Sequence, residues 1–247
     1  MKNSRLPVYL FLLLLVPVDA FSGEWRVSPI RLELGRDAKS GVITLYNEAE
    51  EPLQVQMKAF EWTQDSEGKD RYTETEDLLF FPRIMIFAKK ENRILRVGIR
   101  VPAAVKEKAY RLFIEEIPGP RKSEGVNVAI AIRFGVPVFV KPLKEESKGE
   151  IGNLEMAKRT VRILVRNAGN AHFVIQSVAV TGENAKGEKV FARDISGWYL
   201  LEGVSRLYTT ELPMEVCGEL ARITAEVKAE RFSLTGVLSP DKTMCEP

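Results

Sequence analysis

The chain has 247 residues and nearly balanced charge, with 36 Lys and Arg against 34 Asp and Glu and a formal net charge of +2. This length allows one large or two ordinary domains, and the absence of a basic tract with interleaved aromatics argues against nucleic acid as a partner. Aliphatic β-branched residues recur in short runs between Gly, Pro, Asn and charged clusters, which predicts a mostly β protein.

The first twenty residues have the pattern of a secretory signal peptide. Lys2 and Arg5 precede the apolar run 6–18, and a cleavage site fits at Val18-Asp19-Ala20. A membrane anchor is the alternative, but the run is shorter than the roughly 20 apolar residues that a spanning helix needs. We therefore expect residues 1–20 to be removed, and an exported mature chain without a membrane span.

Strand patterns then follow in short, regularly spaced segments. In the first half they are 25–34, 41–46, 53–62, 78–87 (broken by Pro82), 93–101, 110–118 and 126–142. In the second half they are 160–166, 173–181, 189–192, 199–201, 205–210, 222–229 and 232–237. The motif ITLYN at 43–47, followed by a polar turn and a strand, is weakly repeated as ILVRN at 163–167. This spacing is typical of immunoglobulin-like sandwiches.

We predict an all-β chain of two tandem immunoglobulin-like β-sandwich domains. The charged segment 143–149 is almost free of apolar residues and is interpreted as a linker. The N-terminal domain then covers 21–142 and the C-terminal domain 150–247. Cys217 and Cys245 are the only cysteines; in an exported protein such a pair usually forms a disulfide, with two free buried thiols as the alternative.

The segment 126–142 is the most unusual strand of the chain. Every even position from Val126 to Val140 is apolar, and at about 3.3 Å per residue the segment would span on the order of 50 Å. Pro137 has no N–H to donate, so it places the strand at a sheet edge or at a bulge, where Gly135 would also fit. A long apolar edge strand needs a partner.

Signs of catalysis are scarce. His172 is the sole histidine and is expected to be a solvated turn residue, and no nucleophile motif, phosphate-binding loop or metal-ligand cluster is present. We therefore expect a binding protein rather than an enzyme, with no catalytic residue, metal or cofactor. A carbohydrate-active enzyme would have to draw paired carboxylates from Glu61, Asp65, Glu115 and Glu116, and their spacing does not require it.

Two arginines lie on or near the apolar edge strand 126–142. Arg31 belongs to the first strand and Arg133 to the middle of the long one, and a guanidinium can hold a carboxylate through two hydrogen bonds. Each alone is more often a solvated side chain. Together they suggest strand addition combined with capture of a peptide's terminal carboxylate.

The chain resembles the periplasmic chaperones of the chaperone/usher pathway, the PapD-like family that assembles pili and fimbriae. The segments that carry the resemblance are VSPIRLEL, ITLYNEAEEPLQVQM, YRLFIEEIP, RFGVPVFVKP and GWYLLEGVSRLY. The end of the long strand and the cysteine pair are closer to the archaic branch. The resemblance implies an L-shaped pair of domains in the periplasm, with pilin-like subunits and an outer-membrane usher as partners, and leaves self-association of the free chaperone open.

The resemblance also implies roles for individual residues. The long strand would complete an unfinished subunit, with Val126, Val128, Ile130 and Ile132 as donors; alternatively, these side chains fill the chain's own core. Arg31 matches the first residue that anchors the subunit's carboxylate. In other branches of the family the second anchor is a Lys, and its position falls on Pro137 in this sequence. We therefore take Arg133 as the substitute anchor and Lys141 as a weaker candidate.

An ionic cluster between the domains would map onto Glu116, Lys141 and Asp194. The competing reading of the whole chain is a structural or adhesive exported protein of tandem immunoglobulin-like domains.

Overall fold

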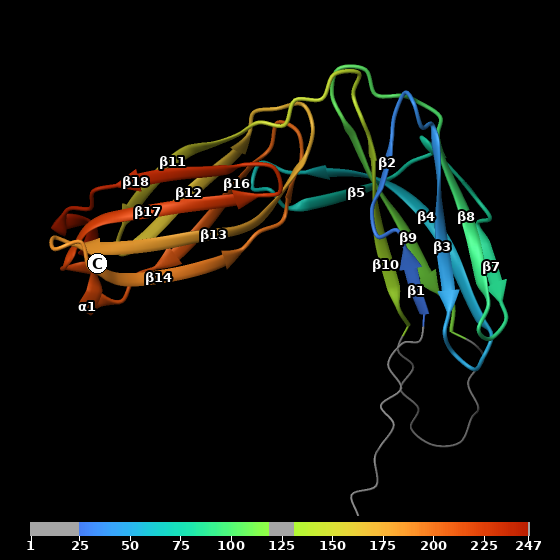
Figure 1. The fold of residues 1–247 in the computed structure, drawn as a ribbon, viewed down its shortest axis with the longest axis horizontal. Helices are drawn as coiled ribbons and strands as arrows, with labels where there is room; N and C mark the ends of the chain where they lie inside the picture. Colours follow the sequence, from blue (N-terminus) through green and yellow to red (C-terminus); the bar gives the residue numbers. More distant parts are fainter. Residues whose placement is uncertain (1–24, 119–130, 247) are drawn as a thin grey trace, which may run out of the picture.

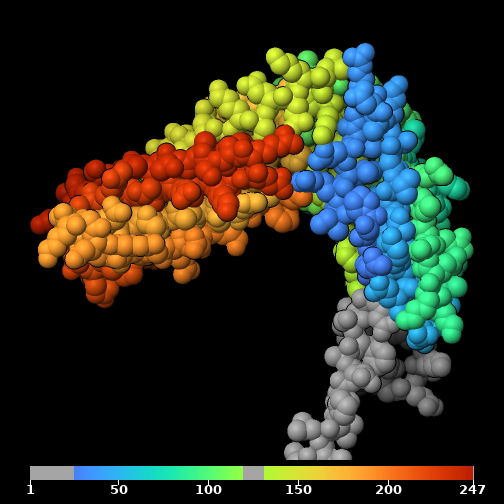
Figure 2. Space-filling model, viewed as in Figure 1, coloured from blue at the N-terminus to red at the C-terminus, as the bar shows by residue number. Residues whose placement is uncertain are grey.

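The computed structural model describes residues 25–118 and 131–246 and confirms the predicted fold class. Two β-sandwiches meet at one end, giving an L shape (Figure 1). The space-filling view shows the same arrangement, with an open angle between the two arms on one side (Figure 2). In these two ranges no helix is long and apolar enough to cross a membrane.

The first sandwich is built from strands β1 to β10. Their bounds are β1 (Trp25–Ser28), β2 (Leu32–Leu34), β3 (Ser40–Asn47), β4 (Leu53–Gln64), β5 (Asp70–Glu74), β6 (Leu78–Phe81), β7 (Ile84–Phe87), β8 (Asn92–Ile99), β9 (Lys108–Glu116) and β10 (Arg133–Val140). One sheet has the order β1-β3-β8-β6, and the other has β2-β10-β9-β4-β5 with β7 paired to β4. The break predicted at Pro82 therefore separates two strands that belong to different sheets.

Alternating apolar positions on both sheets face each other and form the first core. Ile43, Leu45, Leu95, Leu112 and Ile114 are completely buried in it. This is the period of two that a strand with one buried face requires. The predicted strand 25–34 is interrupted at its middle: β1 ends at Ser28 and β2 begins only at Leu32, and Ile30 between them is 79% exposed.

The second sandwich is built from the remaining strands and two short helical turns. Their bounds are β11 (Gly149–Ala157), β12 (Thr160–Asn167), β13 (Phe173–Asn184), β14 (Lys189–Ser196), β15 (Tyr199–Leu200), β16 (Ser205–Glu211), α1 (Met214–Cys217), β17 (Leu220–Ala229), β18 (Ser233–Leu238) and a 3₁₀ turn (Lys242–Cys245). The sheets have the orders β11-β12-β16 and β14-β13-β17-β18, with β15 paired to β13.

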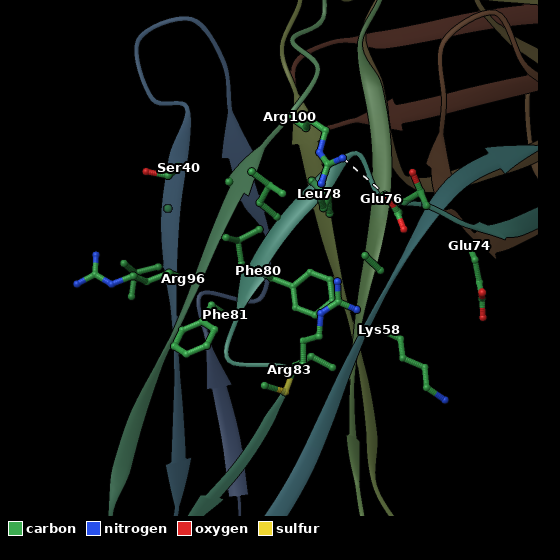
Figure 3. Close-up of a pocket in the computed structure, with 18 residues that line it drawn as sticks. Ser40, Lys58, Glu74, Glu76, Leu78, Phe80, Phe81, Arg83, Arg96 and Arg100 are labelled. Atoms are coloured by element: carbon green, nitrogen blue, oxygen red, sulfur yellow. Dashed lines mark ion pairs between the residues drawn. The ribbon is translucent and has the colours of Figure 1, made fainter.

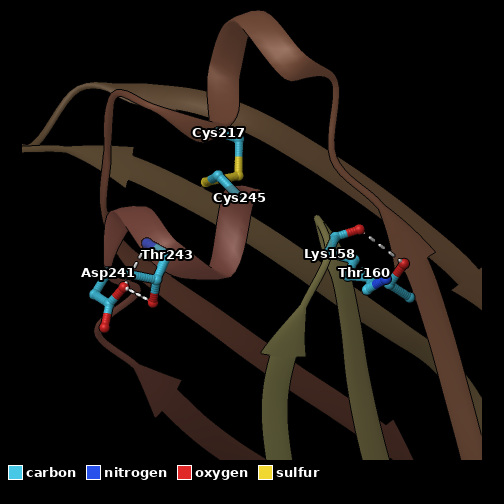
Figure 4. The surroundings of a disulfide bond; sticks show 6 residues. All are labelled: Lys158, Thr160, Cys217, Asp241, Thr243 and Cys245. Atoms are coloured by element: carbon cyan, nitrogen blue, oxygen red, sulfur yellow. Dashed lines mark hydrogen bonds between the residues drawn. A yellow bond between two sulfur atoms is a disulfide. The ribbon is translucent and has the colours of Figure 1, made fainter. Parts of the chain in front are cut away.

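The predicted disulfide is present in this second sandwich. Cys217 at the end of α1 is bonded to Cys245 in the final 3₁₀ turn (Figure 4). The turn itself is capped by Asp241, whose carboxylate accepts a hydrogen bond from the Thr243 N–H. The disulfide therefore ties the C-terminal segment to the core of the second sandwich, to which Cys217 belongs.

Equivalent asparagines explain the repeated motif of the two halves. Asn47 ends β3 and donates its amide to the carbonyls of Glu51 and Ala88, while Asn167 ends β12 and donates to those of Ala171 and Leu200. Each Oδ1 also accepts a backbone N–H two residues further along. Both asparagines are buried, so each joins two loops at the same place in its sandwich.

We expect Asn167→Ala to lower the free energy of unfolding by about 2 to 3 kcal/mol, because it leaves two buried carbonyls without a donor. Chemical denaturation followed by circular dichroism measures this. Asn153→Ala is the matched control: its exposed amide bonds only the Glu155 side chain, so its loss should be within about 0.5 kcal/mol. Equal losses in the two variants would contradict the assigned role.

Candidate functional site

Strand β10 has one complete edge and one incomplete edge. It pairs with β9 along its whole length, from Arg133 opposite Glu115 to Val140 opposite Lys108. On its other side the parallel strand β2 covers only Val138 to Val140. Within residues 25–118 and 131–246, no strand pairs with this side of Arg133 to Pro137.

The hydrogen-bond directions show which peptide groups this open edge presents. The Ile132 carbonyl accepts from Glu116 on the β9 side, whereas the Lys141 N–H donates to Leu34 on the β2 side. Because directions alternate along a strand, the odd residues Arg133, Gly135 and Pro137 point to the open edge. The pairing with β9 shows no register shift, so Pro137 marks a sheet edge here and not a bulge.

The two faces of β10 are buried against different parts of the protein. Val136, Val138 and Val140 lie in the first core, as the alternation predicted. Phe139, on the opposite face, lies in a small cluster with Trp62 and Leu201 that joins the two sandwiches. In the described residues β10 runs from Arg133 to Val140, and the part of the predicted strand at 126–130 lies outside them.

Only one of the four predicted donor residues, Ile132, lies in the described part of the chain. Val126, Val128 and Ile130 lie outside the described residues. Ile132 is half-buried and packs against the first core, so part of its surface already serves the chain itself.

All three predicted anchor cations already have carboxylate neighbours. Arg31 lies 3.3 Å from Glu230 of the second sandwich and 3.6 Å from Glu33. Burial alone would lower the pKa of Arg31, but the charge and hydrogen bond of Glu230, together with smaller contributions from neighbours that include Glu33, raise it.

Arg133 contacts Glu115 at 2.8 Å, and its guanidinium lies 3.6 Å from the centre of the Phe113 ring. Lys141 lies 2.5 Å from Glu33 and 3.9 Å from Glu145. Arg133 is therefore well away from the joint between the sandwiches, toward the far end of β10, while Lys141 is at that joint.

The predicted cluster of Glu116, Lys141 and Asp194 is not brought together. Glu116 ends β9, whereas Lys141 follows Val140, which faces Lys108 at the other end of β9. Glu116 and Lys141 are therefore separated by about 25 Å along the strand. Asp194 lies on β14 opposite Ala179. The ionic network that does join the sandwiches contains Arg31, Glu33, Lys141, Glu145, Glu230 and Arg231.

The expectation of a solvated His172 is wrong. Its side chain is only 10% exposed, its Nδ1 lies 2.7 Å from Glu107 Oε1, and its ring stacks on Phe139 at 3.5 Å. Glu107 also accepts the His172 backbone N–H. His172 is therefore a structural residue of the joint between the sandwiches, and the carboxylate next to it comes from the other sandwich.

Two of the candidate carboxylates of an enzyme have structural partners. Glu115 contacts Arg133 and Lys58, and Asp65 accepts two backbone N–H groups of its own turn and bonds Arg71. In the part of the chain that the structure describes, no three His, Cys, Asp or Glu side chains are grouped to hold a metal ion.

The sequence-based prediction missed Arg111. This residue of β9 faces Pro137 across the ladder and is only 7% exposed. Its Nη1 donates to the Gly135 carbonyl at 2.8 Å, whereas Nε and Nη2 have no hydrogen-bond partner. Its guanidinium lies 3.9 Å from the Trp62 ring centre. The only signal in the sequence was an arginine in an otherwise alternating strand, YRLFI, which is too common to single out.

A second feature is a groove at the opposite edge of the first sandwich, beside β6 (Figure 3). Phe80, Phe81 and Leu79 line it together with Arg83 and Arg96, and Figure 3 shows the Arg83 side chain next to Phe80. Phe81 is 75% exposed. Apolar side chains of this size left in solvent and bordered by arginines are typical of interaction surfaces.

Comparison with known proteins identifies the first sandwich. Residues 25–145 match the family model described as pili and flagellar-assembly chaperone, PapD N-terminal domain. The first sandwich is a pilus-assembly chaperone domain of the PapD type. This family points to a non-enzymatic role. No curated protein matches the chain in sequence.

Solved chaperone structures share the two-domain fold. The Csu pre-assembly complex of chaperone and tip adhesion subunit from Acinetobacter baumannii, of the archaic chaperone-usher type, contains a chain with 17% identity and a TM-score of 0.60, covering 85% of this chain and 97% of that one. For the CupB2 chaperone of Pseudomonas aeruginosa the values are 13%, 0.54, 87% and 99%. For the Salmonella enterica complex of SafA pilin with the SafB chaperone they are 15%, 0.51, 90% and 98%.

Glu33 in the ionic network gives a testable pH dependence. The hydrogen bond from Lys141 lowers the pKa of Glu33 below its usual value of 4.5, aided by the charges of Lys141 and Arg31. A lowered pKa means that ionised Glu33 stabilises the fold above about pH 4.5 and that this contribution is lost as the pH falls through the lowered value. Because the side chain is 32% exposed, we expect less than about 1 kcal/mol.

The measurement is the free energy of unfolding of wild type and Glu33→Gln in low salt. Their difference should be present at pH 7 and should shrink below pH 4.5. Glu76→Gln, at a side chain that is 87% exposed, should show no difference at either pH. A Glu33→Gln effect that is the same at pH 7 and pH 3 would contradict the ionic explanation.

Proposed function

We propose that this protein is a periplasmic chaperone that binds pilin-like subunits by donor-strand complementation and delivers them to an outer-membrane usher. One observation carries the proposal: β10 presents an open edge at Arg133 to Pro137, next to the segment whose apolar positions continue back to Val126. Such an edge invites another chain to pair with it. The family of the first sandwich supports this partner class.

No energy source is required for such binding. Donated apolar side chains contribute roughly 25 cal/mol for each Å² removed from water, and main-chain hydrogen bonds add about 1 kcal/mol each. Val126, Val128 and Ile130 are the proposed donors, and Ile132 contributes the part of its surface that the first core leaves free. Release follows when the strand of a neighbouring subunit replaces the donor.

Delivery to an usher requires a surface that remains accessible while β10 is occupied. The groove beside β6 meets this condition, because β6 and β10 lie at opposite edges of the first sandwich. Export fits the remaining observations: residues 1–20 have a signal-peptide pattern, and Cys217 and Cys245 form a disulfide, which persists in an oxidising compartment.

The decisive experiment is periplasmic co-expression with the small exported β-proteins encoded beside this gene, followed by affinity purification and mass determination. A one-to-one complex with a partner that is unstable alone is the expected result. A chain that purifies alone, or as its own polymer, would favour the structural or adhesive alternative.

The donor residues are tested by Val128→Asn with Ile130→Asn. We expect the double variant to lose at least about tenfold in subunit affinity, because two buried apolar contacts become polar, while its thermal midpoint stays unchanged. Val237→Asn, at a 50% exposed position on β18, is the matched control and should change neither quantity. A large fall in the midpoint of the double variant would mean that these residues fill the chain's own core.

A further inference from the structure

We infer that Gly135 and the ring of Phe113 form a recognition site for one large apolar side chain of a strand bound to β10. This inference rests on the proposed function and names the kind of residue that the bound strand carries. The open edge of β10 has Gly135 at its centre, and the pairing with β9 shows no register shift. A glycine inside a strand that does not mark a bulge often marks a close approach by another chain.

Position 135 has to be glycine because the Phe113 ring occupies the space of a side chain. The two residues face each other across the ladder between β10 and β9. A Cβ placed on Gly135 would lie 2.8 Å from Cε1 of the ring and 3.3 Å from Cδ1. The closer distance is shorter than Cβ atoms tolerate, so the ring overlies the glycine. An aromatic ring in this position replaces contacts that the missing side chain would have made.

Three neighbours hold the Phe113 ring over Gly135. The Arg133 guanidinium lies 3.6 Å from the ring centre. The rings of Phe60 and Tyr72 meet it in T-shaped geometry, each with 5.4 Å between the ring centres. The atoms Cδ1, Cε1 and Cζ form the ring edge nearest to the glycine. A ligand therefore finds this edge already in place and does not have to order it.

The covered glycine is still accessible from the open edge of β10. Arg133 is exposed and Gly135 is partly exposed, whereas Pro137 is buried. A strand that pairs with this edge places every second side chain on the face of the sheet that carries Phe113. One of these side chains lies next to Gly135, about 5 Å away. Because Gly135 has no side chain, a long or aromatic neighbour can extend over the glycine backbone to the Phe113 ring, and a short one cannot.

The surroundings favour an apolar side chain, and an aromatic one above all. The edge of an aromatic ring carries partial positive charge and attracts the face of a second ring, and Phe113 presents such an edge above Gly135. A polar side chain placed there would lose water without gaining a hydrogen bond to either group. An acidic side chain is not favoured, because Arg133 already holds Glu115 at 2.8 Å.

The test uses two heptapeptide amides, Val-Thr-Val-Phe-Val-Thr-Val and the same sequence with Ala at the centre. Each sequence reads the same in both directions, so the result does not depend on the direction of the bound strand. Binding to the purified protein is measured by the fluorescence anisotropy of a dye at the peptide's N-terminus. Wild type should bind the Phe peptide about tenfold more tightly, as expected when one large apolar side chain is buried.

Substitutions assign the preference to this site. Phe113→Leu removes the ring and keeps an apolar side chain, so the preference should fall below about threefold. Phe60→Leu is the matched control, because Phe60 is also partly buried and touches the same ring, but β9 separates its strand from β10. It should keep the tenfold preference. Gly135→Ala fills the space over the glycine and should lower the preference in the same way, and thermal midpoints show that each variant is folded.

Equal binding of the two peptides to wild type would overturn the recognition site and leave strand addition standing. A preference that Phe113→Leu keeps, or that Phe60→Leu also loses, would do the same. If a subunit co-purifies but neither peptide binds, the two variants are compared in that purification. Phe113→Leu should then retain several-fold less subunit than Phe60→Leu, and equal amounts would overturn the inference. If neither peptide binds and no subunit co-purifies, the proposed function fails, and this inference with it.

Discussion

The architecture depends on the unequal pairing of β10. One edge of this strand is bonded to β9 throughout, while β2 covers only the last three residues of the other edge. The paired edge and the buried even residues Val136, Val138 and Val140 hold the strand in the first core. The first half of β10 can therefore present an open edge and still hold a fixed position, because β9 is paired with its other edge. A binding edge held in this way does not need to be ordered when the ligand arrives, which lowers the cost of binding.

The joint between the sandwiches depends on the other face of the same strand. Phe139 packs with Trp62 and Leu201 and stacks on His172, whose Nδ1 contacts Glu107. Apolar packing and the buried His172–Glu107 contact thus come from both sandwiches. The ion pairs around Arg31 and Lys141 lie at this joint and are partly exposed, so each adds little on its own. At this joint the second sandwich places Trp198 and Tyr199 next to Arg111 of β9.

The sequence was sufficient for features that depend on local patterns. Alternation located most of the strands, though not β5 or β11, and the buried face of β10; Pro82 marked the change of sheet between β6 and β7, and Cys217 with Cys245 gave the disulfide. Features that depend on contacts between residues far apart in the sequence could not be predicted from it. Arg31 and Glu230 are 199 residues apart in the chain, and nothing near either one indicates the other. The interdomain cluster was therefore assigned to the wrong residues, and His172 was placed in solvent.

Arg111 shows why a buried charge without a full set of partners is hard to find from the sequence and informative in a structure. Arg111 is the one charged residue among the buried residues of the described ranges, and two of its nitrogens have no hydrogen-bond partner, beside a strand edge that is also incomplete. Two incomplete features at one place are more informative than either alone. Local rules of folding are commonly broken where function requires it.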